Sequence, residues 1–217
     1  MSEPVRRRYD RAAARYDRRW AGYVRRTLDL LEARAAVRPG ERVLDVGCGT
    51  GAFEERLIAA NPQQEVVGVD VSAGMLAEAR RKLAAAPTVR FVEAEATRLP
   101  FDDGAFDTVV SASALHYVPD PAAALGEVAR VLAVGGRLVL LDWDRSRPGM
   151  AVLDAVLRVL DPAHAGALSA AEAEALLGQG GLEGSAERVR AGRWGLFVLR
   201  AVKPGPPAGA TTPESPS

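Results

Sequence analysis

A buried strand pattern that runs directly into three closely spaced glycines constrains this chain more than any other feature. The segment Val43–Gly51 reads VLDVGCGTG, and a helix pattern follows it at once. Glycines let the backbone turn tightly and let a ligand approach it without obstruction by side chains. The spacing G-x-G-x-G differs from the G-x-G-x-x-G of dinucleotide-binding loops, and it lacks the Gly-Lys-Ser/Thr of a P-loop. We therefore expect a ligand at the carboxyl end of this strand.

Short apolar runs alternate with helical patterns along the first two thirds of the chain. Strand patterns occupy residues 42–47, 65–70, 89–93, 106–112 and 136–142, with helix patterns at 52–60, 72–86 and 120–132 between them. This alternation predicts an α/β fold with a parallel sheet that helices cover on both faces. Two further strand patterns, 183–190 and 194–202, flank Gly192 and predict an antiparallel hairpin at the end of the sheet.

We expect a single domain over residues 1–203, with helical patterns at both sides of the central alternation. Residues 1–35 are predicted to form an N-terminal helical lid, and residues 143–182 a helical insertion. Residues 204–217 are rich in proline and are predicted to be a disordered tail. In the lid, Tyr9, Tyr16 and Tyr23 recur every seven residues with Trp20 between the last two, so these aromatic rings share one helix face. That face could pack on the domain, cover a pocket, or do both.

The composition excludes several classes of protein. The 28 Lys and Arg residues balance 28 Asp and Glu residues, which argues against a nucleic-acid partner. No apolar run approaches the roughly 18 residues of a membrane span, so we expect no integral membrane segment. The single cysteine, Cys48, excludes a disulfide framework and a cysteine-built metal site, and it favours a cytoplasmic location. The nine arginines within residues 1–26 could attract an anionic substrate or could form a solvated helix face.

Two acidic residues narrow the choice of ligand. Asp70 ends the second strand, where a carboxylate can accept hydrogen bonds from both hydroxyls of a ribose. This leaves a nicotinamide dinucleotide or S-adenosylmethionine as the cofactor. Asp45 lies within the first apolar strand, where an acid is costly unless it is paired. The cationic ammonium and sulfonium of S-adenosylmethionine would suit Asp45, whereas a pyrophosphate would be repelled.

Four sequence motifs, in this order along the chain, resemble those of a known family. They are VLDVGCGTG, VVGVDVSAGMLAEAR, EAEATRLPFDDGAFDTVVSASALHYVPDP and LAVGGRLVLLDW. Together they resemble the class I S-adenosylmethionine-dependent methyltransferases, and the most similar subgroup is the ubiquinone/menaquinone-biosynthesis-like methyltransferases. The resemblance covers about residues 9–203. It implies a Rossmann-like three-layer sandwich whose seven-stranded sheet has the order 3-2-1-4-5-7-6 with the last strand antiparallel.

The resemblance also implies roles for individual residues. The implied cofactor-binding residues are Asp45, Gly47, Cys48, Gly49, Gly51, Asp70, Val71, Met75, Glu95, Ala96 and Ser111. Asp45 and the glycine loop would hold the methionine part, Asp70 the ribose, and Val71 and Met75 the adenine. Glu95 stands where the family usually has Asp, a departure that lengthens the side chain by one methylene.

A catalytic base is needed only if the acceptor must lose a proton. His116 is the candidate, because it follows the fourth strand on the ligand side and histidine titrates near neutral pH. The alternative is a buried histidine that bridges backbone groups. The acceptor pocket is predicted to include Tyr9, Tyr16, Trp20, Tyr117 and Trp143, and no metal is expected. We expect Asp144 to be solvated and His164 to lie in a surface loop.

The sequence thus predicts an enzyme that transfers the methyl group of S-adenosylmethionine to a small organic acceptor. O- or C-methylation of an aromatic, quinone-like or secondary metabolite is favoured. The alternatives are a nicotinamide-dependent dehydrogenase and a non-catalytic S-adenosylmethionine-binding protein. The protein is expected to be a monomer or a homodimer.

Overall fold

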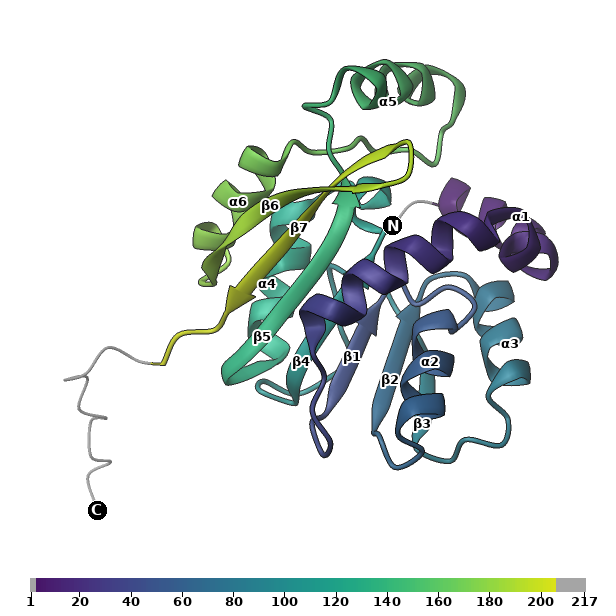
Figure 1. The fold of residues 1–217 in the computed structure, drawn as a ribbon, viewed down its shortest axis with the longest axis vertical. Helices are drawn as coiled ribbons and strands as arrows, with labels where there is room; N and C mark the ends of the chain where they lie inside the picture. Colours follow the sequence, from purple (N-terminus) through teal and green to yellow (C-terminus); the bar gives the residue numbers. More distant parts are fainter. Residues whose placement is uncertain (1–2, 206–217) are drawn as a thin grey trace.

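One mixed β-sheet forms the centre of the protein (Figure 1). The computed structural model describes residues 3–205. The strands are β1 (Val43–Val46), β2 (Val66–Asp70), β3 (Val89–Glu93), β4 (Phe106–Ala112), β5 (Leu132–Trp143), β6 (Glu183–Ala191) and β7 (Trp194–Val202). The helices are α1 (Glu3–Ala35), α2 (Ala52–Ala60), α3 (Ala73–Lys82), α4 (Pro121–Val131), α5 (Pro148–Leu160) and α6 (Ala170–Gln179), with a 3-10 turn, η1 (Leu115–Tyr117).

The sheet has the order β3-β2-β1-β4-β5-β7-β6. Pairing is parallel from β3 through β5, and β7 runs antiparallel to both β5 and β6. The predicted Rossmann-like α/β fold, its strand order and its antiparallel last strand are therefore confirmed. The loops that follow β1, β2, β4 and β5 all lie at the carboxyl ends of these strands, which is where the sequence predicts the cofactor site.

Two hydrophobic clusters cover the two faces of the sheet. Leu44 of β1 and Val109 of β4 point to the face where α4 and α6 pack. Their neighbours Val43 and Val110 point to the opposite face, where α1 and α2 pack. This alternation follows from the period of two along a strand, and burial on both faces explains why these strands are almost continuously apolar.

Helix boundaries follow local chemistry, with one difference from expectation. The Ser72 hydroxyl accepts a hydrogen bond from the backbone N–H of Met75, as expected for the cap of α3. The helix nevertheless ends at Lys82, although the sequence pattern predicts helix to residue 86. Pro87 disfavours a helical conformation in Ala86, and the backbone N–H of Ala86 instead bonds to the carbonyl of Leu83 in a turn that leads into β3.

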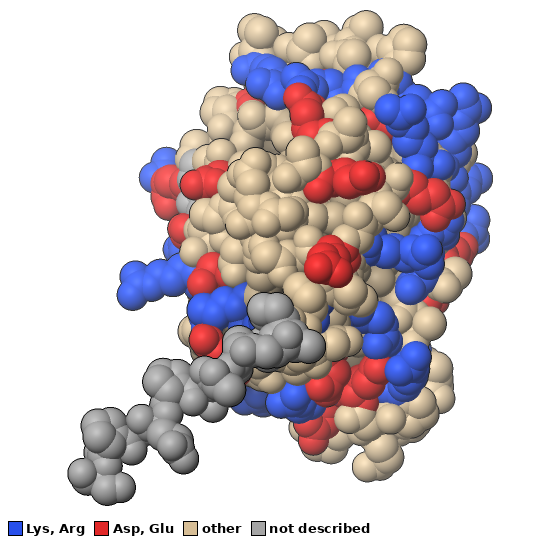
Figure 2. Space-filling model, turned by 90° about the vertical axis from the view of Figure 1, so that its left-hand side faces the viewer, with Lys and Arg blue, Asp and Glu red and all other residues tan. Residues whose placement is uncertain are grey.

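Helix α5 stands apart from the sheet at the top of Figure 1. Its solvent side is apolar, with Val152, Val159 and Leu160 exposed by 66%, 82% and 74%. Figure 2 shows uncharged surface at this top end, and acidic and basic side chains interspersed over the face below it. Within residues 3–205, no helix combines the length and the apolar character that spanning a bilayer requires. Residues 206–217 of the predicted tail lie outside the described residues.

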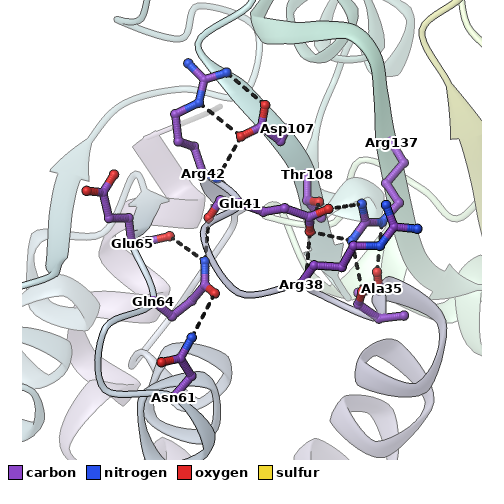
Figure 3. Close-up of polar contacts among 11 residues, drawn as sticks. Ala35, Arg38, Glu41, Arg42, Asn61, Gln64, Glu65, Asp107, Thr108 and Arg137 are labelled. Carbon is purple, nitrogen blue, oxygen red and sulfur yellow. Dashed lines mark hydrogen bonds and ion pairs between the residues drawn. The ribbon is translucent and has the colours of Figure 1, made fainter.

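A polar network ties the elements together at the opposite, amino end of the strands (Figure 3). The Arg137 guanidinium donates to both carboxylate oxygens of Glu41 at 2.7 and 2.6 Å, and to the carbonyl of Ala35 at the end of α1 at 2.8 Å. The Glu41 carboxylate also accepts from the backbone N–H of Arg38 and the hydroxyl of Thr108. These bonds hold the pKa of Glu41 below its usual value. The network joins α1, β4 and β5 away from the site.

We expect Glu41→Gln to lower the free energy of unfolding by about 2 kcal/mol at pH 7, because it removes charged hydrogen bonds that are largely shielded from water. The lowered pKa of Glu41 means that its stabilisation is present above the unfolded carboxyl pKa, about 4.3, and is lost as the pH falls through the folded value. Urea unfolding at neutral and acidic pH measures both effects. Glu187→Gln is the control, since Glu187 also binds an arginine, Arg34, but is 54% exposed and should cost less than about 1 kcal/mol. Equal losses in the two variants would contradict the assignment.

Candidate functional site

The glycine loop after β1 has the conformation that its sequence predicts. Gly47, Gly49 and Gly51 all have positive φ angles, of 81°, 55° and 76°. A Cβ atom on Gly47 would lie 2.4 Å from the Cβ atom of Ala114, so this glycine is required by packing. A Cβ atom on Gly49 would meet no atom within 4 Å, so the backbone there borders open space. The middle of the loop is therefore free for a ligand to approach.

Asp70 is fixed at the end of β2 by the loops around it. One carboxylate oxygen accepts the backbone N–H of Gly49 at 3.0 Å, and the other accepts that of Ser72 at 2.9 Å. The carboxyl group is only partly accessible, and burial raises its pKa. Each oxygen retains a lone pair, so Asp70 is held in place and can still accept hydrogen bonds from a diol.

Asp45 has a different environment. It is 4% exposed, and its Oδ1 has no hydrogen-bond partner among the described residues. Burial and the nearby charge of Asp70 raise its pKa. A buried carboxylate without a partner is costly, and a cation placed beside it would remove that cost. Asp45 and the open backbone at Gly49 therefore fit the cationic methionine end of S-adenosylmethionine.

Glu54, in the first turn of α2, is a member of this acidic group that the sequence analysis missed. It is 0% exposed, and neither carboxylate oxygen has a hydrogen-bond partner among the described residues. Burial and the repulsion of Asp45 raise its pKa well above the usual value. No local sequence signal marks Glu54, because acidic residues are favoured in the first turn of any helix, and only the packing of α2 on the sheet buries its side chain.

A narrow apolar cavity lies between the ends of β1, β2 and β4. Its volume is about 30 Å³, and Gly47, Asp70, Val71, Ala96 and Ser111 of the predicted cofactor set line it. Met75, in the first turn of α3, is buried and is not among the residues that line this cavity. Glu95 forms an isolated bridge with Arg98.

Cys48 has no sign of a reactive thiol. It is 8% exposed, and burial together with the surrounding acids raises its pKa well above the usual value. A thiol with a raised pKa is a poor nucleophile at neutral pH. Nothing in its surroundings therefore activates Cys48 as a nucleophile.

A second, larger cavity of about 380 Å³ lies beside the first. His116 and all five predicted acceptor-pocket residues, Tyr9, Tyr16, Trp20, Tyr117 and Trp143, line it. The segment after β4 separates the two cavities, because Ala114 and Leu115 line the small one whereas Ser113 and His116 line the large one. The structure thus brings the predicted residues together, while their contact with an acceptor stays a prediction.

His116 is held in one orientation in this second cavity. Its Nδ1 lies 2.6 Å from Oδ1 of Asp142, and the ring stacks on Trp143 with centroids 4.2 Å apart and planes at 11°. The His116 side chain is 2% exposed, and its Nε2 has no hydrogen-bond partner among the described residues. An ionised Asp142 accepts the Nδ1 proton, which leaves the lone pair on Nε2. This is the arrangement of an oriented general base.

The aromatic wall contains residues that the predicted set omitted. The hydroxyl of Tyr23 lies 2.6 Å from the hydroxyl of Ser113 and accepts the indole N–H of Trp143 at 2.9 Å. Trp194, at the start of β7, stacks on Trp143 at 5.6 Å. Tyr23 was detected in the heptad pattern, whereas Trp194 is far from it in sequence and only the hairpin fold brings it there. Arg8 and Arg19 of α1 also line the cavity.

Helix α1 is tied to the loops after β1 and β2 by the aspartates that follow Tyr9 and Tyr16. Asp10 accepts the hydroxyl of Ser72 at 2.6 Å and the backbone N–H of Gly74 at 2.9 Å. Asp17 accepts the hydroxyl of Thr50 at 2.5 Å, and Lys82 at 2.9 Å. Each Tyr-Asp pair therefore places a ring in the larger cavity and a carboxylate on the loops of the smaller one.

Two expectations about polar residues are wrong. Asp144 is not solvated: it is 0% exposed, and its Oδ1 accepts the backbone N–H groups of Ser146, which precedes α5, and of Ala170, the first residue of α6. His164 is not on the surface: it is 6% exposed and its Nε2 lies 2.7 Å from Asp154 of α5. Both residues stand in a polar, loop-like sequence, and only the packing of α5 and α6 buries them.

Comparisons with known proteins agree with this geometry. Residues 44–140 match the family described as "Methyltransferase domain". These residues belong to that methyltransferase family. The predicted resemblance to class I S-adenosylmethionine-dependent methyltransferases is thereby confirmed, and the dehydrogenase alternative is set aside. Within residues 3–205 no group of three or more His, Cys, Asp or Glu residues could hold a metal ion.

Curated relatives of the methyltransferase domain carry a common description. The demethylmenaquinone methyltransferase of Beutenbergia cavernae is 42% identical over 160 residues, which are 72% of this chain and 61% of the relative. That of Thermus thermophilus is 47% identical over 128 residues, which are 58% of this chain and 55% of the relative. The chain thus spans little more than half the length of these relatives.

Solved structures share the fold at low identity. One is a chain in the complex of the Haloferax volcanii Trm112 methyltransferase activator with a methyltransferase, with a TM-score of 0.82, 23% identity, and coverage of 93% of this chain and 98% of that one. Another is the geranyl diphosphate C-methyltransferase of Streptomyces coelicolor, with a TM-score of 0.67, 18% identity, and coverage of 81% and 76%. At these identities the likeness supports the fold.

We expect Glu54→Gln to stabilise the ligand-free methyltransferase domain. The raised pKa of Glu54 makes the ionised form unfavourable in the folded state, so its destabilising effect grows as the pH rises above the unfolded pKa of about 4.3. The variant should therefore melt roughly 3–6 °C above the wild type at pH 8, and the gain should shrink at pH 5. Thermal unfolding at the two pH values measures this difference. Glu55→Gln is the matched control, because Glu55 is 60% exposed, and a pH-dependent gain in that variant would refute the explanation.

Proposed function

We propose that this protein transfers the methyl group of S-adenosylmethionine to a small aromatic or quinone-like hydroxylated acceptor. The observation that carries the proposal is the His116–Asp142 pair: His116 lines an aromatic cavity, its Nδ1 is bonded to Asp142, and its Nε2 has no hydrogen-bond partner among the described residues. The curated relatives named as demethylmenaquinone methyltransferases support a quinone-like acceptor.

Residues at the carboxyl ends of β1 and β2 are suited to hold the cofactor. The Asp45 carboxylate would pair with its cationic methionine end, and Asp70 would accept the ribose hydroxyls. Val71 and Ala96, which line the small apolar cavity, would border the adenine. When bound, S-adenosylmethionine supplies an electrophilic methyl group on a good leaving group, so much of the catalysis can come from positioning and exclusion of water.

His116 would take the proton of the acceptor hydroxyl or of an acidic ring position. The Asp142 hydrogen bond keeps the lone pair on Nε2 and stabilises the imidazolium that forms. The stack on Trp143 prevents the ring from rotating away. Deprotonation places a negative charge on the acceptor, which strengthens it as a nucleophile for an in-line displacement.

The larger cavity suits a flat, mostly apolar acceptor. Its wall of Tyr, Trp and Leu side chains offers ring faces and edges for stacking. The hydroxyl groups of Tyr23 and Ser113, which are hydrogen-bonded to each other, are polar groups within this wall. Arg8 and Arg19 give one side of the cavity positive charge, which would favour an acceptor that is, or becomes, anionic.

We expect titration calorimetry to detect S-adenosylhomocysteine binding with a Kd below about 1 mM, and Asp45→Asn to weaken it at least about ten-fold. Because burial raises the pKa of Asp45, placing the ammonium group of S-adenosylhomocysteine beside it should release a proton, so the heat should depend on the ionisation enthalpy of the buffer. That dependence should vanish in Asp45→Asn and persist in Glu55→Gln. If the wild type does not bind S-adenosylhomocysteine at about 1 mM, the proposal is wrong.

We expect His116→Gln and Asp142→Asn each to lower kcat by about 10²-fold or more, with the S-adenosylhomocysteine affinity unchanged within about three-fold. Transfer of a labelled methyl group to a panel of hydroxylated quinones and naphthols provides the measurement. An unchanged kcat in His116→Gln would assign His116 a structural role. If the wild type binds the cofactor but methylates no member of the panel or of a cell extract, the non-catalytic alternative holds.

A further inference from the structure

A further concave surface, which we call the arginine groove, adjoins the larger cavity. It lies between the start of α5 and the turn that joins β6 to β7, which is next to α5 in Figure 1. Its volume is about 510 Å³. Leu153 and Trp194 line both the groove and the larger cavity, so the two spaces meet at these two side chains. The cofactor residues proposed above do not line the groove.

The groove carries a concentration of positive charge. Arg147, Arg190 and Arg193 line it, and none of the described residues that line it is acidic. Arg26 of α1 is also close, because a Cβ atom on Gly192 would lie 2.9 Å from Nη1 of Arg26. A guanidinium stays protonated at any pH at which the enzyme would work, and its planar set of donors matches the oxygens of a carboxylate or a phosphate.

The protein itself supplies little negative charge to match these arginines. Arg26, Arg190 and Arg193 form no ion pair with another described residue. Nε of Arg147 lies 4.0 Å from Oδ2 of Asp144, and the same oxygen lies 3.4 Å from Nε of Arg188. Neither contact is a hydrogen bond, since this Oδ2 has no hydrogen-bond partner among the described residues. One buried carboxylate therefore stands against several guanidinium groups.

A row of stacked groups connects the groove with the proposed base. The Arg193 guanidinium lies over the Trp194 ring at 5.0 Å, and Trp194 stacks on Trp143 with centroids 5.6 Å apart and planes at 17°. Trp143 stacks in turn on His116. Trp194, Trp143 and His116 all line the larger cavity. A ring bound in that cavity would therefore lie along a row that has the base at one end and a guanidinium at the other.

The remaining walls of the groove suit a short chain that ends in an anion. Met150 and Leu153 provide aliphatic surface. Pro148 and Gly149, in the first turn of α5, also line the groove, and the amino end of a helix carries partial positive charge. A Cβ atom on Gly149 would meet no atom within 4 Å, so the backbone there borders open space.

We propose that the arginine groove binds an oxyanion, a carboxylate or a phosphate, which the methyl acceptor carries on a short chain beyond its ring. This inference rests on the proposed function, because it places the ring of the same acceptor in the larger cavity. The groove then selects acceptors by charge. Binding at two points also fixes the ring relative to His116, so that the atom to be methylated is presented in one orientation.

Titration calorimetry with the whole ligand-free chain tests the proposal without cofactor or turnover. The probes are monoethers of dihydroxynaphthalene with alkyl chains of graded length that end in a carboxylate, a phosphate or a neutral carboxamide. At the best chain length, we expect at least one of the two anions to bind about ten-fold or more tightly than the carboxamide of the same length. Equal affinities at every length, or no binding of either anion at about 5 mM, would overturn the proposal.

A double variant shows where the anion binds. Arg190 and Arg193 are exposed, so Arg190→Gln combined with Arg193→Gln should leave the fold intact and should remove most of the ten-fold preference. Arg90→Gln combined with Arg200→Gln is the matched control, because both of these arginines are exposed, neither lines the groove, and the net charge changes equally. The control should keep the preference within about two-fold. A preference that survives in the groove variant, or that falls equally in the control, would contradict the assignment.

Methyl transfer to the same probes separates this inference from the proposed function. On a methylated anionic probe, we expect the groove variant to raise KM at least about five-fold and the control variant to leave it unchanged. If the anions bind through Arg190 and Arg193 but no probe is methylated, the groove binds oxyanions and the proposed function is in error. If the probes are methylated with equal KM values for the anions and the carboxamide, the proposed function holds and the assignment of the groove is wrong.

Discussion

Buried carboxyl groups at the carboxyl ends of the parallel strands are the constraint on which the rest of this site depends. Asp45, Asp70 and Asp142 all lie near the carboxyl ends of strands, where the surroundings are apolar and ionised groups need partners. The three carboxyl groups differ in their hydrogen-bond partners. Asp142 has a histidine, Asp70 has two backbone N–H groups, and Asp45 keeps an oxygen without a partner. The carboxylates of Asp142 and Asp70 are thereby held in fixed orientations as hydrogen-bond acceptors. The carboxyl group of Asp45 is free to pair with a cation.

Such an arrangement costs stability in the free protein. Glu54 adds a second enclosed carboxyl group beside Asp45, and nothing among the described residues neutralises either of them directly. The large two-sided core and the Glu41–Arg137 network at the far edge of the sheet offset this cost. The two ends of the strands therefore differ in their electrostatics. At the amino ends, the Glu41 carboxylate is paired with the Arg137 guanidinium. At the carboxyl ends, the carboxyl groups of Asp45 and Glu54 have buried oxygens without a hydrogen-bond partner among the described residues, and a bound cation could pair with them. The acids without charged partners lie at the carboxyl ends of the strands, which is where open α/β sheets bind their ligands.

Most of the fold could be predicted because its signals are local or repeat with a fixed period. The glycine loop, the apolar strands and the Ser72 cap depend on residues that are neighbours in the chain. The early end of α3 depended on competition between helix propensity and Pro87, which a pattern alone resolves poorly. His164 and Trp194 could not be placed, because their positions follow from how α5 and the final hairpin fold back over the sheet. His116 could be selected from its place after a strand, whereas its partner Asp142 emerged from the pairing of β4 with β5.

The heptad of Tyr-Asp pairs in α1 has a structural consequence. Asp10 and Asp17 hold the helix on Ser72 and Thr50, while Tyr9 and Tyr16 on the same turns wall the larger cavity. Any movement that lifts these turns from the glycine loop also removes that wall. The aromatic wall of the larger cavity and the hydrogen bonds at Ser72 and Thr50 are therefore coupled through a single helix.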